Sequence, residues 1–143
     1  APKFISIKDI QQPYEDKLNY FEDMAKEFPL EQITIVTDFP SYDSILAKPN
    51  NQNPNYSDRF EIYLGPMEVA NGFNELTDAA VQRALMQEQS GPEMEYDEEY
   101  CDALEWGLMP CTGVGIGIDR LVMWLLGKST IKDVITFPFY KRK

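Results

Sequence analysis

The sequence contains no histidine and only two cysteines, Cys101 and Cys111. Without histidine, the chain cannot by itself form a Ser-His-Asp or Cys-His catalytic site, or a histidine-ligated zinc site. Two cysteines are too few for a disulfide framework or a four-cysteine metal site. Any chemistry in this chain must therefore come from carboxylates, arginine, lysine, amides and the backbone.

Basic residues are also scarce. There are 13 Lys and Arg residues against 24 Asp and Glu residues, which gives a net charge of -11. No basic residue occurs between Arg83 and Arg120, and the only locally basic run is at residues 141–143. Because an acidic surface repels phosphates, we do not expect this segment to be a main binder of a nucleic-acid backbone.

Long apolar runs are absent. The longest, from Leu121 to Leu126, has six residues, far fewer than the roughly 20 that a membrane helix needs. No signal-peptide pattern opens the chain. These features predict a cytoplasmic protein with no membrane partner, and the first residue, Ala1, suggests a piece of a longer chain.

The 143 residues are enough for one domain with a sizeable core. Apolar residues at helical spacing predict a helix at residues 13–28, and the β-branched run Ile33–Thr37 predicts a buried strand that Pro40 ends. The strand-like stretch from Arg59 to Leu76 is interrupted at Gly65-Pro66, which predicts a β-hairpin.

The remaining elements follow from caps and glycines. We expect a helix from Asp78 to about Gln89, a loop at Ser90–Tyr96, a helix from Asp97 to near Gly107, a strand at Gly113–Ile118, a helix from Asp119 to Gly127, and a helical turn or strand at residues 131–137. The fold class is α+β: one domain over residues 1–143, with a helical segment at 1–30 and an antiparallel sheet flanked by helices at 31–143.

Three glycines alternate with apolar residues in the strand that precedes Asp119-Arg120. In a strand, Gly113, Gly115 and Gly117 share one face. Glycine weakens strands, so three on one face need a reason: either a flat ligand such as adenine or another packed element approaches closely. Arg120 lies in the first turn of the next helix, where the dipole opposes a cation. It therefore needs an anionic partner, either a triphosphate or a carboxylate of the protein.

The hairpin carries two carboxylates. With Gly65-Pro66 as the turn, Tyr63 lies opposite Glu68 and Glu61 lies opposite Ala70, so Glu61 and Glu68 become diagonal neighbours on one face. Mg²⁺ binds one or two carboxylates together with phosphate oxygens and waters. Taken alone, the pair fits a solvated acidic face better than a metal site.

Further along the second strand, Asn71, Phe73 and Glu75 share a face. An amide, an aromatic ring and a carboxylate together suit a cationic amine, although an ordinary edge strand fits this spacing about as well. Regular alternation would place Glu68 on the other face. If all four residues serve one ligand, a β-bulge or sharp twist must occur around Ala70–Gly72.

Together these segments resemble the C-terminal half of the catalytic domain of class II aminoacyl-tRNA synthetases of the lysyl type. The run GVGIGIDRLVMW resembles motif 3 of that class, and RFEIYLGPMEVANGFNELTDA resembles the paired strands with the metal and lysine ligands. YDEEYCDALEWGLMPCTG resembles the segment before motif 3, and IKDVITFP resembles the usual C-terminal end. The likeness covers roughly residues 33–138.

The resemblance implies specific roles. Glu61 and Glu68 would hold Mg²⁺-ATP, and Arg120 would meet the γ-phosphate. The lysine pocket would be lined by Asn71, Phe73, Glu75 and Gly115. The surface beneath the adenosine of ATP would be formed by Gly113 and Gly117. The implied activity is that of a ligase of protein biosynthesis and translation, which activates lysine as lysyl-adenylate and transfers it to an acceptor.

Motifs 1 and 2 of the family, the second of which carries the arginine that holds the α-phosphate, are absent from these 143 residues. The resemblance therefore implies an isolated segment that is inactive, within a complete protein that is a homodimer. The alternative is a non-catalytic, synthetase-like binding or assembly module.

Two acceptors stay open, and both would bind mainly outside this chain. One is tRNA-Lys. The other is elongation factor P, which a shorter paralogue modifies with β-lysine. The runs Ala70–Phe73, Glu75–Ala79 and Cys111–Val114, together with Ser44, favour the paralogue, whereas Gly115 and the stretch Asn53–Glu61 resemble the synthetase. On balance these features favour the paralogue.

Overall fold

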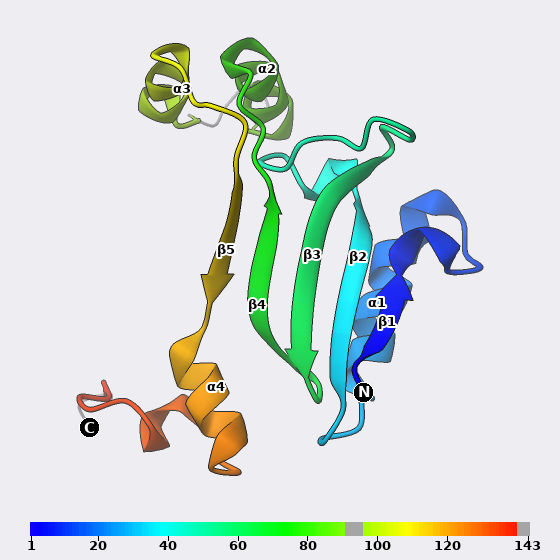
Figure 1. Cartoon of the computed structure of the whole chain (residues 1–143), viewed down its shortest axis with the longest axis vertical. Coiled ribbons are helices and arrows are strands. Elements are labelled where there is room, and N and C mark those ends of the chain that lie inside the picture. Colours follow the sequence, from blue (N-terminus) through cyan, green and yellow to red (C-terminus); the bar gives the residue numbers. More distant parts are fainter. Residues whose placement is uncertain (91–95, 140–143) are drawn as a thin grey trace.

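The computed structural model describes residues 1–90 and 96–139. Its centre is a five-stranded sheet in the order β1-β2-β3-β4-β5 (Figure 1). The strands are β1 (Lys3–Ser6), β2 (Ile33–Pro40), β3 (Tyr56–Leu64), β4 (Met67–Asn74) and β5 (Thr112–Ile116). The α-helices are α1 (Lys17–Lys26), α2 (Ala79–Ser90), α3 (Glu98–Glu105) and α4 (Ile118–Leu125), and short 3-10 turns occur at Ile7–Asp9, Tyr14–Asp16, Ser41–Asp43 and Ile131–Asp133.

The sheet confirms the α+β class and is antiparallel from β2 to β5. The exception is β1, which pairs in parallel with β2, with Lys3 opposite Thr34 and Ser6 opposite Thr37. Residues 3–6, which we placed in a helical segment, therefore form an edge strand. Four residues carry too little periodic signal to identify a strand, and their backbone partners lie some thirty positions away on β2.

Most local signals gave the expected elements. The Gly65-Pro66 turn joins β3 to β4, and Asp78 accepts hydrogen bonds from the first N–H groups of α2 at Ala80 and Val81. The Asp97 side chain accepts the N–H of Tyr100 and caps α3. Helix α4 begins at Ile118, one residue earlier than expected, and most of the loop expected at Ser90–Tyr96 lies outside the described residues, as does the basic run at 141–143.

The best-sealed core lies between α1 and the sheet beneath it, at the β1–β2 side of the molecule (Figure 1). Ile7, Phe21, Val36 and Phe39 are at most 1% exposed. The Phe21 ring makes edge-on contacts with Phe39 and with Tyr63 of β3. Burial of these side chains holds α1 against the sheet, since each fully buried large apolar side chain contributes about 1.5–3 kcal/mol.

The other helices lie at the ends of the sheet. Figure 1 shows α2 and α3 beyond the end where β4 stops and β5 starts, and α4 at the far end of β5. Arg83 of α2 joins the two helices through ion pairs with three carboxylates of α3: Glu98, Asp102 and Glu105. Within the described residues, no helix is long and apolar enough to cross a membrane.

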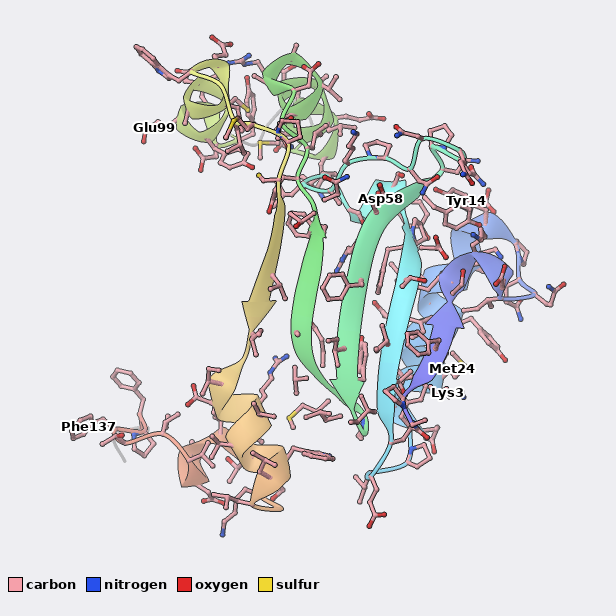
Figure 2. All side chains as sticks on the ribbon, viewed as in Figure 1. Lys3, Tyr14, Met24, Asp58, Glu99 and Phe137 are labelled. Carbon is pink, nitrogen blue, oxygen red and sulfur yellow. The ribbon has the colours of Figure 1, made fainter. Side chains whose placement is uncertain are left out.

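The β5–α4 side leaves apolar side chains in solvent. Val114 and Ile116 on β5 are each 55% exposed, and Leu125 on α4 is 65% exposed. Phe137 projects from the C-terminal segment, away from the sheet (Figure 2). This side therefore presents an apolar surface next to the strand that carries the glycine run.

Candidate active site

A β-bulge at Val69 organises the candidate site. Glu61 pairs with Asn71 and Arg59 with Phe73, but Tyr63 pairs with Glu68, so one extra residue of β4 lies between Ala70 and Glu68. Side chains directly opposite one another share a face. The bulge therefore brings Glu68 to the face of Glu61 and Asn71, as the site requires.

The bulge confirms the expected irregularity, one residue before the predicted span, and corrects one pairing: Glu61 lies opposite Asn71, not Ala70. A bulge leaves backbone groups free of the ladder. The Val69 carbonyl accepts the N–H of Gly117 at 2.8 Å, and the Glu68 carbonyl accepts Nη1 of Arg120 at 2.8 Å. The segment after β5 thus takes up the acceptors that the bulge frees.

Glu61 is the most enclosed acid of the site, with a side chain 7% exposed. Its Oε1 accepts Nη2 of Arg59 at 2.6 Å, and its Oε2 accepts the Tyr63 hydroxyl at 2.8 Å. Burial raises the pKa of the Glu61 carboxyl above its ordinary value, and the bonds from Tyr63 and Arg59 oppose that rise. Nδ2 of Asn71 on β4 also donates to Oε1, at 3.4 Å, so three donors on one sheet face hold the charged form.

Glu68 lies beside Arg120. The Arg120 guanidinium is 3.9 Å from Oε2 of Glu68, and the side chains are 51% and 36% exposed. The anionic partner that the position of Arg120 demanded is thus Glu68 within this chain. Because the pair is partly in solvent, its attraction is modest, and Arg120 keeps free donors for a further anion.

Glu61 and Glu68 also border a common pocket of about 240 Å³ between α1 and the sheet, together with Tyr63. No cluster of three or more acids, cysteines or histidines that could hold a metal occurs among the described residues. Two carboxylates nevertheless fit Mg²⁺, which completes its octahedral shell with phosphate oxygens and waters. The donor set at this pocket thus suits a Mg²⁺-nucleotide better than Mg²⁺ alone.

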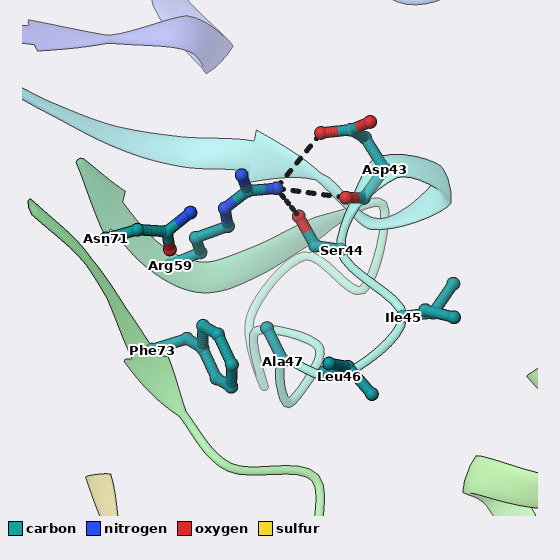
Figure 3. Close-up of a pocket in the computed structure, with 8 residues that line it drawn as sticks. All are labelled: Asp43, Ser44, Ile45, Leu46, Ala47, Arg59, Asn71 and Phe73. Carbon is teal, nitrogen blue, oxygen red and sulfur yellow. Dashed lines mark hydrogen bonds and ion pairs between the residues drawn. The ribbon is translucent and has the colours of Figure 1, made fainter. Parts of the chain in front are cut away.

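Asn71 and Phe73 line a second pocket of about 220 Å³, closed on its other side by the loop at residues 43–47 (Figure 3). Arg59 holds this loop through bonds from Nη1 to the Asp43 carboxylate, the Asp43 carbonyl and the Ser44 hydroxyl. The side-chain carbonyl of Asn71 is buried and has no hydrogen-bond partner. An orphaned acceptor beside a pocket is suited to a ligand that brings an N–H donor.

Glu75 follows β4 and is held by backbone bonds: its N–H donates to the Cys111 carbonyl, and it forms a bridge with Ala47. Burial raises the pKa of its carboxyl above 4.5. Glu75 and Gly115 do not line the Asn71–Phe73 pocket, so only part of the expected lysine set surrounds one cavity. The bridge to Ala47 nevertheless places Glu75 next to the loop that closes it.

The two glycines of β5, Gly113 and Gly115, have different surroundings. A Cβ at Gly113 would lie 2.6 Å from Oε1 of Glu75, so glycine there makes room for a side chain of the protein itself. A Cβ at Gly115 would meet only the Asn71 carbonyl, at 3.9 Å, which is ordinary contact. Packing in this chain therefore accounts for Gly113 but not for Gly115, whose expected role beside a ligand stays a prediction.

Sequence reasoning did not assign Arg59, Tyr63 and the loop at 43–44 to the site. Arg59 and Tyr63 are two residues before and after Glu61, so strand periodicity alone places all three on one face. That signal was present in the sequence. Nothing local predicted the loop contact, because Asp43 and Arg59 are 16 positions apart.

Known proteins match this chain over most of its length. A lysine–tRNA ligase from Psychrobacter arcticus is 45% identical over 130 residues, which cover 86% of this chain and 25% of that protein. The heat-inducible lysine–tRNA ligase of Escherichia coli K12 is 46% identical over 125 residues, 82% of this chain and 25% of that protein. A lysine–tRNA ligase from Sodalis glossinidius is 48% identical over 125 residues, which cover 82% of this chain and 24% of that protein.

The chain spans about a quarter of the length of these curated relatives. The family described as tRNA synthetases class II (D, K and N) matches residues 5–141, nearly the whole chain. The fold agrees with that match, because an antiparallel sheet carries the paired carboxylates on β3 and β4 and the glycine run on β5. The chain belongs to the class II tRNA synthetase family that comprises the D, K and N types.

Proposed function

We propose that this chain forms the C-terminal part of an active site that activates lysine with ATP as lysyl-adenylate and passes the lysyl group to an acceptor. One observation carries the proposal: the bulge at Val69 gathers Glu61, Glu68 and Asn71 on one sheet face, next to Arg120. Carboxylates for Mg²⁺ and a cation for phosphate then lie at one place, next to the pocket that Asn71 and Phe73 line.

In the proposed reaction, a carboxylate oxygen of lysine attacks the α-phosphorus of ATP. The bond from that phosphorus to the bridging oxygen breaks, and pyrophosphate leaves. No general base is needed, because the attacking carboxylate is already ionised. Catalysis is therefore positional and electrostatic.

The chain's own residues have separate tasks in this scheme. Glu61 and Glu68 hold Mg²⁺, which when bound neutralises phosphate charge. Arg120 binds the outer phosphates through the donors that Glu68 leaves free. Gly117 lies beneath the nucleotide and Gly115 lies beside lysine, while Gly113 leaves room for the Glu75 carboxylate.

Glu75 provides the selectivity for lysine. It pairs with the ε-ammonium, while Phe73 packs against the alkyl stem and Asn71 accepts a donor through its orphaned carbonyl. A neutral substrate would leave the partly buried Glu75 carboxylate unpaired, at a cost of about 1–3 kcal/mol. Uncharged amino acids are rejected for that reason.

The first-choice acceptor is tRNA, because the relatives are named lysine–tRNA ligases. The second is elongation factor P, favoured by the resemblance of residues 70–79 to the shorter paralogue. We place the complete protein in the cytoplasm as a homodimer. Charging of tRNA-Lys and modification of elongation factor P, assayed side by side with the protein of the whole reading frame, decide between the acceptors.

The test of the lysine and metal roles is Glu75→Gln in that protein. The substitution keeps the size and one acceptor but removes the charge. Loss of a desolvated ion pair to the substrate costs about 2–5 kcal/mol, so kcat/KM for lysine is expected to fall roughly 30-fold to several thousandfold in ATP–pyrophosphate exchange.

Glu61→Gln is the matched control. It is expected to weaken the use of Mg²⁺-ATP and to be partly rescued by more Mg²⁺, whereas Glu75→Gln is not. Unchanged kcat/KM for lysine in Glu75→Gln, or equal rescue of both variants by Mg²⁺, would overturn the two assignments. Absence of any lysine-dependent exchange by the unmodified protein would favour the non-catalytic module.

A further inference from the structure

Tyr63 has no role in the scheme above, yet it touches the centre of the site. Its hydroxyl donates to Oε2 of Glu61 at 2.8 Å. Across the ladder it lies directly opposite Glu68, because the bulge at Val69 shifts the register at this point. One side chain thus neighbours both proposed Mg²⁺ carboxylates, and it borders the same pocket.

The Tyr63 ring is held in place by the sealed core. It contacts Phe21 of α1 and Phe28 edge-on, with ring centroids 5.8 Å apart in each case and interplanar angles of 82° and 85°. Two aromatic neighbours at these angles leave the ring little freedom to turn. The position of the hydroxyl is therefore set by the packing of α1, not by the site itself.

Tyr63 acts on Glu61 differently from Arg59. Arg59 neutralises the carboxylate that it binds, at 2.6 Å from Oε1, and so competes with any other cation. A phenol donates a hydrogen bond without adding charge. It can fix the direction of the carboxylate while the negative charge stays available to Mg²⁺, which is how outer-shell donors support metal ligands.

We propose that Tyr63 is a positioning residue for the Mg²⁺ site: its hydroxyl, fixed by Phe21 and Phe28, orients Glu61 for the metal of Mg²⁺-ATP. This inference rests on the proposed function, specifically on Glu61 as a Mg²⁺ ligand. It extends the site from the β3–β4 hairpin to the core beneath α1. Tyr63 does not line the pocket of Asn71 and Phe73, so we expect no contact between Tyr63 and lysine.

The test is Tyr63→Phe in the protein of the whole reading frame, which removes the hydroxyl and keeps the ring. Binding of a non-hydrolysable ATP analogue is measured by calorimetry at increasing Mg²⁺. Loss of an outer-shell partner commonly lowers metal affinity by about 10- to 100-fold. The half-saturating Mg²⁺ concentration is therefore expected to rise at least about tenfold, with affinity for the analogue restored at high Mg²⁺ and affinity for lysine unchanged.

Tyr56→Phe is the matched control, because Tyr56 is also a buried tyrosine of β3 and its ring packs on Tyr14. It is expected to leave the Mg²⁺ requirement unchanged. An equal Mg²⁺ requirement in Tyr63→Phe and the unmodified protein overturns the inference and leaves the proposed function intact. If Tyr63→Phe loses affinity for lysine together with affinity for Mg²⁺, the role of Tyr63 is merely structural and the inference is overturned. If the unmodified protein binds the analogue independently of Mg²⁺, both the inference and the proposed metal site are overturned.

Discussion

The two sides of the sheet differ in how they bury apolar surface. At the β1–β2 side, α1 covers the strands, and Ile7, Phe21 and Val36 are at most 1% exposed. At the other side, β5 and α4 leave Ile116 and Leu125 more than half exposed. The candidate site lies between them, on β3 and β4, with Arg120 and the glycine run supplied by the open side.

This difference suggests a division of labour. The sealed side stabilises the fold and holds Tyr63 against Glu61, whereas the open side carries Arg120 and the glycine run, the ligand contacts that we propose. Stability and substrate recognition should therefore respond to substitutions at different places.

The largest expected effect is on stability. Phe21→Ala should lower the free energy of unfolding by about 3–5 kcal/mol, because it empties a fully enclosed position. Leu125→Ala, on the open face of α4, should stay within about 0.5 kcal/mol. Urea denaturation of the two variants measures the contrast, and similar losses would show that the sides do not differ as described.

The second prediction concerns the activity of this chain by itself, with its part of the active site only. The 143-residue chain by itself should form lysyl-adenylate about 10²–10³ times more slowly than a full-length lysine–tRNA ligase, because the arginine of motif 2 is not in it and one such contact has that effect. Lysine-dependent ATP–pyrophosphate exchange, with the E. coli K12 enzyme for comparison, measures this. Exchange within about tenfold of that enzyme, a gap of only ~1.4 kcal/mol, would contradict it.

The third prediction uses pH to separate the site from the fold. Burial raises the pKa of Glu75 above 4.5, so this carboxyl becomes protonated at a pH where an ordinary glutamate is still charged. Since only the charged form pairs with an ammonium, KM for lysine should rise as the pH is lowered from neutral toward 4.5, by up to about tenfold per pH unit below the raised pKa.

The corresponding control is Glu75→Gln, whose KM for lysine should be high and nearly independent of pH in this range. The sign follows from protonation: a raised carboxyl pKa favours the neutral form, which helps folding at low pH and removes the counter-ion for lysine. A KM profile of the unmodified protein as flat as that of the variant would remove Glu75 from the lysine site.

The smallest effects are expected on β5. Gly113→Ala should raise KM for lysine severalfold. The added Cβ would lie only 2.6 Å from Oε1 of Glu75, so the carboxylate would have to move. Gly115→Ala fits the unliganded chain, so its thermal midpoint should equal that of the unmodified protein, and a smaller rise in KM would report contact with the ligand itself. An unchanged KM in Gly115→Ala would leave that glycine without a role in binding.

Much of the site could be predicted from local sequence. The alternation of Glu61 with Tyr63, the turn at Gly65-Pro66 and the cap at Asp78 all depend on neighbouring residues, and the structure has each of them. The need for a bulge also followed from the sequence, because regular alternation would have separated Glu68 from Asn71. Its place at Val69 did not, since it depends on Gly117 and Arg120 bonding to the freed carbonyls.

The sequence by itself determined the chemistry: carboxylates and arginine instead of histidine or cysteine, on strands and turns encoded within a few residues. The tertiary structure alone decided which groups meet. It paired β1 with β2, set the Asp43 loop against Arg59, placed the Tyr63 hydroxyl on Glu61 through the packing of α1, and filled the space above Gly113 with Glu75. The reason is physical: local rules fix the face a side chain occupies, whereas its partner depends on packing between segments far apart in the chain.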